Sequence, residues 1–406
     1  MSSTPSFLND FPHRPYQRRQ RIVWCALICL CLLVLSWFTF PSIGRADGGA
    51  PNLAYISGTT TGVSVIDVAA RRLTRTFSID GDPQTILLSA DGSFLYVTQP
   101  QKGRVSVLDA ARGTIHCSVT IPGNPSLLTL SPQGDVLYVA GNHDSHVRAL
   151  NPDTCAVQQT FALPGPVYGL GVSFLGGSFP AHIGLYQLWV ATTDMLTVLD
   201  TDGKSLASFA VSAGPQSICI PPGFVIYVTT RQDTVIAVNL ATKTVTPPLL
   251  TGGTFGPMDY DANTGEVYVP DLTHQQVDVL TPLSSETTQK APKEPNRVLH
   301  MDGVPVSVAI TSDGQLGFVA MQNGRVAMVD VPGRQIVSTL TVGGHPHFLI
   351  TGLYPPPVTT SQQSPPPQLF SWKTIIFWLC VAIFVLSLVA LLVVLQLMWK
   401  QRSREG

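Results

Sequence analysis

Residues 84–121 read QTILLSADGSFLYVTQPQKGRVSVLDAARGTIHCSVTI, and the pattern within them indicates the fold of the chain. It holds four short runs rich in Val, Ile, Leu and Thr, at 84–89, 94–98, 104–108 and 114–121. Gly/Asp turns separate the first run from the second and the third from the fourth. Short β-branched runs bounded by turn residues predict four antiparallel strands in this unit.

The same pattern recurs along the chain, and each copy contains one aromatic residue between apolar neighbours. These aromatic residues are Tyr55, Tyr96, Tyr138, Trp189, Tyr227, Tyr268 and Phe318. Four of their spacings are near 42 residues, and the other two, of 50 and 51, indicate insertions. Because a period of about 40–45 residues is typical of propeller blades, we expect an all-β, seven-bladed β-propeller of four-stranded antiparallel blades.

The two ends of the repeat region predict how the ring closes. The first repeat begins at its second strand, 53–57, and the last strand, 348–352, has no repeat of its own. We expect this C-terminal strand to pair into the first blade, which removes the open sheet edges. Acidic and amide residues after the third strands recur from blade to blade, so we interpret them as turn caps rather than catalytic groups.

Several short motifs match one known repeat family. They are Tyr96-Val97-Thr98, Val63-Ser64-Val65-Ile66-Asp67, Val105-Ser106-Val107-Leu108-Asp109 and Ser312-Asp313-Gly314. Residues 52–352 thereby resemble the YVTN-type β-propeller repeat family, whose known members include surface-layer proteins, lactonase-like propellers and the propeller of heme-type nitrite reductases. The resemblance implies the blade and no particular chemistry.

The near-neutral net charge of −1 hides two opposite contributions. Residues 1–46 and 372–406 together carry nine basic and two acidic side chains, whereas 47–371 carries 15 basic and 23 acidic ones. An acidic repeat region argues against nucleic acid as a partner.

Two apolar runs, 22–40 and 373–399, lie inside these basic ends, and each is long enough to cross a bilayer core of roughly 30 Å. The positive-inside rule then places both chain ends in the cytoplasm and the repeats outside the cell membrane. Residues 41–46 also resemble a signal-peptidase site, so the first run is either an anchor or a cleaved signal.

These features predict the following organisation: a cytoplasmic basic tail at 1–21, a transmembrane signal-anchor or signal sequence at 22–40, a linker at 41–52, the propeller at 53–352, a Pro-rich stalk at 353–372, a transmembrane helix at 373–399 and a basic tail at 400–406. Cys117, Cys155 and Cys219 are scattered through the propeller, and we interpret them as small buried thiols.

Propeller topology predicts which face binds a partner. Both chain ends leave the ring on one face, whereas the blade-to-blade links lie on the opposite, membrane-distal face. Polar residues of the links could form a funnel at the central channel. The candidates are Asp82, Gln84, Asn124, Tyr168, Gln216, Asp302, His345 and His347.

Three further histidines, His143, His146 and His274, are weaker candidates for a metal site, since they lie in loops of the same face nearer the rim. The chain has no Gly-x-Ser-x-Gly nucleophile motif and no Cys-x-x-Cys-His haem attachment, so we expect no cofactor.

The sequence favours a membrane-anchored extracytoplasmic scaffold that binds a protein, peptide or envelope glycan. The alternatives are a lactonase-like hydrolase that uses the funnel and a structural surface-coat subunit.

Overall fold

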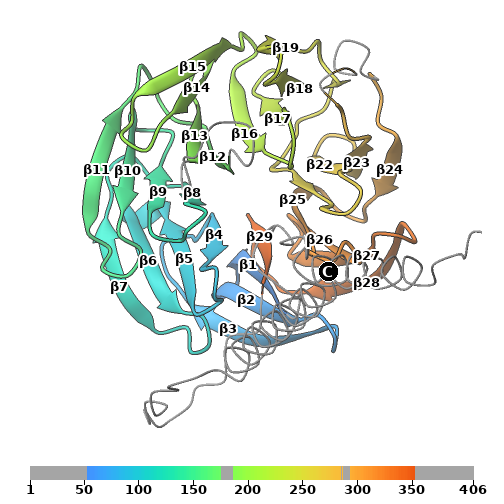
Figure 1. Cartoon of the computed structure of the whole chain (residues 1–406). Helices are drawn as coiled ribbons and strands as arrows, with labels where there is room; N and C mark the ends of the chain where they lie inside the picture. The colour runs from blue at the N-terminus through green and yellow to red at the C-terminus, as the bar shows by residue number, and fades with distance from the viewer. Residues whose placement is uncertain (1–52, 175–185, 285, 287–292, 353–406) are drawn as a thin grey trace, which may run out of the picture. The chain divides into compact units, whose positions relative to one another are not determined.

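The computed structural model describes residues 53–174, 186–284, 286 and 293–352. Over these ranges the chain forms 29 strands and one short 3-10 turn, η1 (Pro100–Lys102). The strands make seven antiparallel sheets that stand around a common axis, as Figure 1 shows. The expected all-β, seven-bladed propeller is therefore confirmed.

The first four blades each have four strands, with the first strand innermost. Blade 1 holds β29 (Leu349–Gly352), β1 (Leu53–Thr59), β2 (Gly62–Asp67) and β3 (Arg72–Ser78). Blade 2 holds β4 (Ile86–Leu88), β5 (Phe94–Gln99), β6 (Arg104–Asp109) and β7 (Ile115–Thr120). Blade 3 holds β8 (Leu127–Leu130), β9 (Leu137–Ala140), β10 (His146–Leu150) and β11 (Val157–Ala162). Blade 4 holds β12 (Gly169–Phe174), β13 (Tyr186–Ala191), β14 (Met195–Leu199) and β15 (Ser205–Ala210).

In blade 5 the outermost strand is split. This blade holds β16 (Pro215–Cys219), β17 (Val225–Thr230), β18 (Thr234–Asn239), β19 (Thr244–Val245) and β20 (Leu250–Thr251). Pro247 and Pro248 separate β19 from β20, because proline lacks the N–H that a continuous ladder needs. Blade 6 holds β21 (Asp259–Tyr260), β22 (Val267–Asp271), β23 (Gln276–Leu280) and β24 (Arg297–His300). Blade 7 holds β25 (Pro305–Ile310), β26 (Leu316–Met321), β27 (Arg325–Asp330) and β28 (Gln335–Thr341).

The ring closes as the sequence predicts, because β29 pairs antiparallel with β1. Leu53 pairs with Gly352 on one side and with Asp67 on the other, and Asp67 pairs with Arg72. Both ends of the propeller chain thus lie in one row at the same end of blade 1. We call the face at this end the chain-end face, and the opposite face, which carries the links between blades, the link face.

The seven repeat aromatics form the core of the second strands, and none is more than 3% exposed. Each pairs across the sheet with a third-strand residue, which is Val in blades 1, 2, 4 and 6 and Met in blade 7. In blades 3 and 5 this residue is the smaller Ala149 or Ala237. Because an alanine fills less space than valine or methionine, these two blades carry less side-chain volume beside their aromatic ring.

The recurring polar residues after the third strands cap turns, as expected. Asp67 Oδ1 accepts a hydrogen bond from the Ala70 backbone N–H at 2.8 Å. The carboxylates or amides of Asp109, Asn151, Asp200, Asn239 and Asp330 accept equivalent bonds in their own turns. Their role is therefore local and structural.

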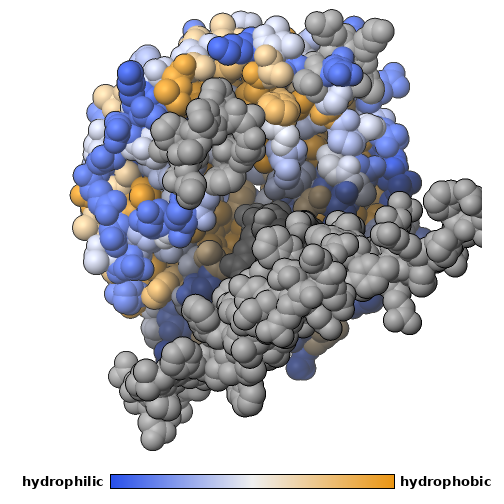
Figure 2. All heavy atoms as spheres, in the orientation of Figure 1, coloured by the Kyte–Doolittle hydropathy of each residue, from blue (hydrophilic) through white to orange (hydrophobic). Residues whose placement is uncertain are grey.

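The outermost strands are irregular. The pairing between the third and fourth strands shifts register at one point in blades 1, 2, 3, 4 and 7. Such bulges, together with charged and polar side chains, protect exposed edges from pairing with other chains. In Figure 2 the rim that carries β7 and β11 is mostly hydrophilic, with single hydrophobic residues between.

The interpretation of Cys117 and Cys155 as separate thiols is wrong. Their sulfur atoms form a disulfide, with the two Cα atoms 6.0 Å apart. The bridge joins β7 of blade 2 to the turn before β11 of blade 3, because equivalent outer positions of adjacent blades lie side by side. Cys219 is a buried thiol, as expected.

The two predicted membrane runs, 22–40 and 373–399, lie outside the described residues, as do the linker 41–52 and the Pro-rich stretch 353–372. Within the part of the chain that is described, no helix is long and apolar enough to cross a bilayer.

Candidate functional site

One pair of sequence-predicted residues meets across two neighbouring links on the link face. His347 Nε2 lies 2.9 Å from Asp82 Oδ1, although 265 residues separate them in the chain. The two side chains are 34% and 36% exposed, so the pair can be reached from solvent. Gln101 Nε2 approaches the other Asp82 oxygen at 3.4 Å. A histidine held against a carboxylate can accept or donate a proton, or bind a polar ligand.

The backbone around His347 explains why this pair forms. The His347 N–H donates to the Ser57 carbonyl at 3.1 Å, and the His345 N–H donates to the Gly58 carbonyl at 2.8 Å. Gly58 has a φ of +75°, and a Cβ there would lie 2.6 Å from His347 Cδ2. Only glycine combines that backbone conformation with so close an approach of the imidazole ring. Asp82 itself has a φ of +55°, which turns its side chain at the link.

A second link residue makes an aromatic contact. The Arg231 guanidinium carbon lies 4.2 Å from the centroid of the Tyr168 ring, in a cation–π arrangement. Arg231 also donates to the Thr193 carbonyl, so its guanidinium is fixed between blades 4 and 5. No sequence motif singles out Arg231, because it lies 63 residues from Tyr168 and in a different blade.

The remaining funnel candidates do not join one site. Asp302 forms an ion pair with Arg325 of its own blade at 2.5 Å, and Asn124 Nδ2 lies 3.5 Å from His143 Nδ1. The Gln84 carbonyl accepts a hydrogen bond from the Ser57 hydroxyl. Gln216 and His345 are exposed. Among the eight funnel candidates, all of which lie in the described part of the chain, only His347 and Asp82 form a hydrogen bond with each other.

The three rim histidines also lie apart, each with a partner of its own. His143 Nδ1 lies 2.6 Å from Asn142 Oδ1, and His146 Nδ1 lies 2.6 Å from Asp144 Oδ1. Burial acts to raise the pKa of Asp144, but hydrogen bonds from His146 and Arg148 outweigh it and hold the pKa below its usual value. Across the described ranges, no three His, Cys, Asp or Glu side chains are grouped to hold a metal ion.

His274 belongs to a cluster that sequence reasoning missed in part. Its Nδ1 lies 2.6 Å from Asp271 Oδ2, and this hydrogen bond raises the pKa of His274. Asp271 and Asp278 are only 2% and 3% exposed, so blade 6 buries two carboxylates together. Burial, and then the charge of Asp271, raises the pKa of Asp278 to about 6.

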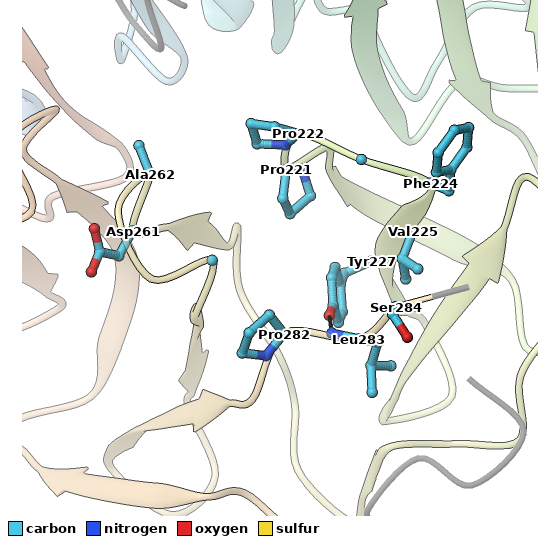
Figure 3. Close-up of a pocket in the computed structure, with 12 residues that line it drawn as sticks. Pro221, Pro222, Phe224, Val225, Tyr227, Asp261, Ala262, Pro282, Leu283 and Ser284 are labelled. Atoms are coloured by element: carbon cyan, nitrogen blue, oxygen red, sulfur yellow. Dashed lines mark hydrogen bonds between the residues drawn. The ribbon is translucent and has the colours of Figure 1, made fainter. Parts of the chain in front are cut away.

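Two pockets open on the chain-end face, and neither contains a sequence-predicted site residue. The first, of about 320 Å³, lies between blades 5 and 6. Figure 3 shows its proline walls, Pro221, Pro222 and Pro282, with the Tyr227 hydroxyl accepting a hydrogen bond from the Leu283 N–H at 2.9 Å. Phe224 at its edge is 56% exposed. The second, of about 350 Å³, lies between blades 3 and 4 and has a more polar lining.

Solved structures with a similar fold come from proteins of different kinds. Dihydro-heme d1 dehydrogenase NirN in complex with DHE has a TM-score of 0.55 and 15% identity, over 77% of each chain. Hydrazine synthase of Kuenenia stuttgartiensis has a TM-score of 0.57 and 16% identity, over 72% of this chain and 99% of that one. The propeller domain of Cps50 (Swd1) from Myceliophteria thermophila has a TM-score of 0.54 and 13% identity, over 68% of this chain and 91% of that one.

No family model and no curated protein matches the sequence. At identities of 13–16% these likenesses show the fold alone. The chain is therefore a seven-bladed β-propeller, and this fold alone does not define a function.

Proposed function

We propose that this chain is a membrane-anchored, extracytoplasmic propeller of the YVTN-type repeat family that binds a protein, peptide or envelope glycan through its link face. The pairing of Leu53 with Gly352 carries this proposal. Because both chain ends leave from one face, anchors on both sides would hold the chain-end face toward the membrane. The link face, with its loops on a rigid scaffold, would then be free for a partner.

Two observations support the extracytoplasmic placement. Basic residues flank the apolar runs on the outer sides, which is the usual pattern for cytoplasmic ends. The Cys117–Cys155 disulfide is the kind of bond that persists in oxidising compartments and is rare in the cytosol.

The placement is tested with a specific protease site inserted between Gln362 and Gln363 of the full-length chain. In intact cells, added protease should cut this site and leave a matched site inserted after Asn9 uncut until detergent is added. Protection of the Gln362 site in intact cells would contradict the proposed topology.

Binding is tested with a photo-cross-linker placed at the exposed His345 of the link face. The matched control carries the same group at Ala70, which is exposed on the chain-end face. We expect a discrete cross-linked product at position 345 and none at 70. Equal labelling at both positions, or no product at 345, would contradict binding through the link face.

One observation favours a second function, that of a lactonase-like hydrolase. His347 lies within hydrogen-bond distance of Asp82, as general acid–base chemistry requires. A hydrolase should release acid from a panel of lactones at constant pH, and His347→Gln and Asp82→Asn should each lower the rate about 100-fold or more. If the unaltered chain releases no acid from the panel, the hydrolase reading is rejected.

A further inference from the structure

The polar pocket between blades 3 and 4 has a buried floor of two tyrosines. The hydroxyls of Tyr138 and Tyr186 lie 2.7 Å apart, and their rings meet edge-on with centroids 6.2 Å apart. Burial, together with the hydrogen bond to Tyr186, raises the pKa of Tyr138, so both hydroxyls stay protonated at neutral pH. One hydroxyl donates its proton to the oxygen of the other, so the pair presents one further O–H group and its oxygen lone pairs at the bottom of the pocket.

Ala149 explains why a pocket exists at this place. It pairs with Tyr138 on one side and Gln159 on the other, in the row where blades 1, 2, 4 and 6 carry valine. The missing methyl groups leave a hollow above the tyrosine pair. The pocket of blade 5 also lies beside an aromatic residue that pairs with alanine, Tyr227 with Ala237.

A bulge in β11 supplies one wall. Leu150 pairs with Val157 and Ala149 with Gln159, so Gln158 is an extra residue in the strand. Gln158 and Gln159, although consecutive, both line the pocket. Bulges commonly redirect a side chain in this way. Two primary amides, each with a donor and an acceptor group, therefore stand on the same side of the opening.

One acidic residue also lines the pocket. It is Asp135, whose Oδ1 accepts a hydrogen bond from the Ser131 hydroxyl at 2.6 Å. Thr201 of blade 4 adds a hydroxyl. Within the described part of the chain, the residues that line this pocket include no Lys, Arg or His. Its electrostatics thus oppose an anionic ligand, while its amides, hydroxyls and carboxylate match a ligand rich in hydroxyl groups.

We propose that this pocket binds one unit of a neutral saccharide. Its volume of about 350 Å³ lies at the lower end of the range for small-molecule sites, which suits a single sugar ring. Sugar hydroxyls would form hydrogen bonds with the amides of Gln158 and Gln159 and with the Asp135 carboxylate. The site lies on the chain-end face and shares no residue with the link face. The test of this pocket is therefore independent of the test of the proposed function.

The experiment uses the full-length chain in lipid nanodiscs, without glycoside detergents because their sugar head groups would compete. Saturation-transfer NMR and titration measure binding of maltotriose, N,N′-diacetylchitobiose and methyl β-galactoside, with glucuronate and free lysine as charged probes. We expect saturable binding of at least one neutral sugar and none of glucuronate. Absence of neutral-sugar binding up to about 10 mM, or preference for glucuronate or lysine, would overturn the proposal.

Two variants test the location of the site, and a third variant serves as the matched control. Ala149→Val introduces the residue that four other blades carry in this row, so it should fill the hollow and weaken binding more than 10-fold without unfolding the ring. Gln159→Ala removes only an exposed amide and should weaken binding about 10-fold. Gln335→Ala, on the outermost strand of blade 7, should leave binding unchanged. Unaltered binding by Gln159→Ala together with Ala149→Val would overturn the assignment.

Discussion

Asp278 is a polar residue that the propeller buries, although its place in an alternating strand predicts exposure to solvent. The stretch Gln276–Leu280 alternates polar and apolar residues, a pattern that predicts one solvated sheet face. In a ring of blades both faces of a sheet pack against neighbours, so the polar face is buried as well. Asp278 is therefore 3% exposed, with Gln276 Nε2 donating to its carboxylate at 2.9 Å.

The raised pKa of Asp278 predicts how its protonation affects stability. The folded protein holds this proton up to a pKa of about 6, whereas the unfolded chain releases it near 3.8. The stabilisation is therefore complete below pH 3.8 and is lost as the pH rises through 6. Asp278→Asn should raise the free energy of unfolding above pH 6 by up to about 3 kcal/mol, with little effect at pH 4. Urea unfolding of both chains between pH 4 and 8 measures the difference, and parallel pH profiles would contradict it.

At the scale of elements, the Cys117–Cys155 bridge couples two blades that otherwise meet through side chains. The sequence contained a signal for it, because the two cysteines are 38 residues apart, close to one repeat period. Residues one period apart occupy equivalent places in adjacent blades. Without the strand positions, however, spacing alone could not show that both cysteines lie at the outer rim.

Removing this bridge should destabilise the propeller. Replacing Cys117 and Cys155 together by alanine should lower the free energy of unfolding by about 2–4 kcal/mol, since the closed loop constrains the unfolded chain. A reducing agent should lower the melting temperature of the unaltered chain and have no effect on the double variant. An equal effect of the reductant on both would show that the bridge is not responsible.

The closing strand β29 offers a test of the ring itself. Leu349 is 1% exposed and packs in a cluster with Ile56 and Phe318 of blades 1 and 7. Leu349→Ala should therefore cost about 2–5 kcal/mol of stability. Leu206→Ala, at a leucine that is 51% exposed on β15, should cost less than about 0.5 kcal/mol. Chemical denaturation compares the two, and similar costs would contradict a stabilising role for the closure.

At the scale of the whole molecule, the fold was predictable because the same sequence pattern is repeated seven times. The aromatic residues, the turn caps and the unpaired strand predicted at 348–352 all agree with the structure. Where the pattern is weak in one repeat, the strands of that repeat can still be assigned from the other six. The site was less predictable, because its contacts join residues in different blades. His347 and Asp82 meet, whereas Asp302 and Asn124 turn to local partners. Sequence places residues on a face, but side-chain rotamers decide which of them touch.

The pairing of Leu53 with Gly352 also has a mechanical consequence. Tension between the two chain ends would act on neighbouring antiparallel strands at the same end, across hydrogen bonds that run perpendicular to them. Such a load opens the bonds one after another, like a zipper, instead of shearing them all at once. The seam between β29 and β1 would therefore be the first to yield, and a pull on the ends would open the ring at one defined blade.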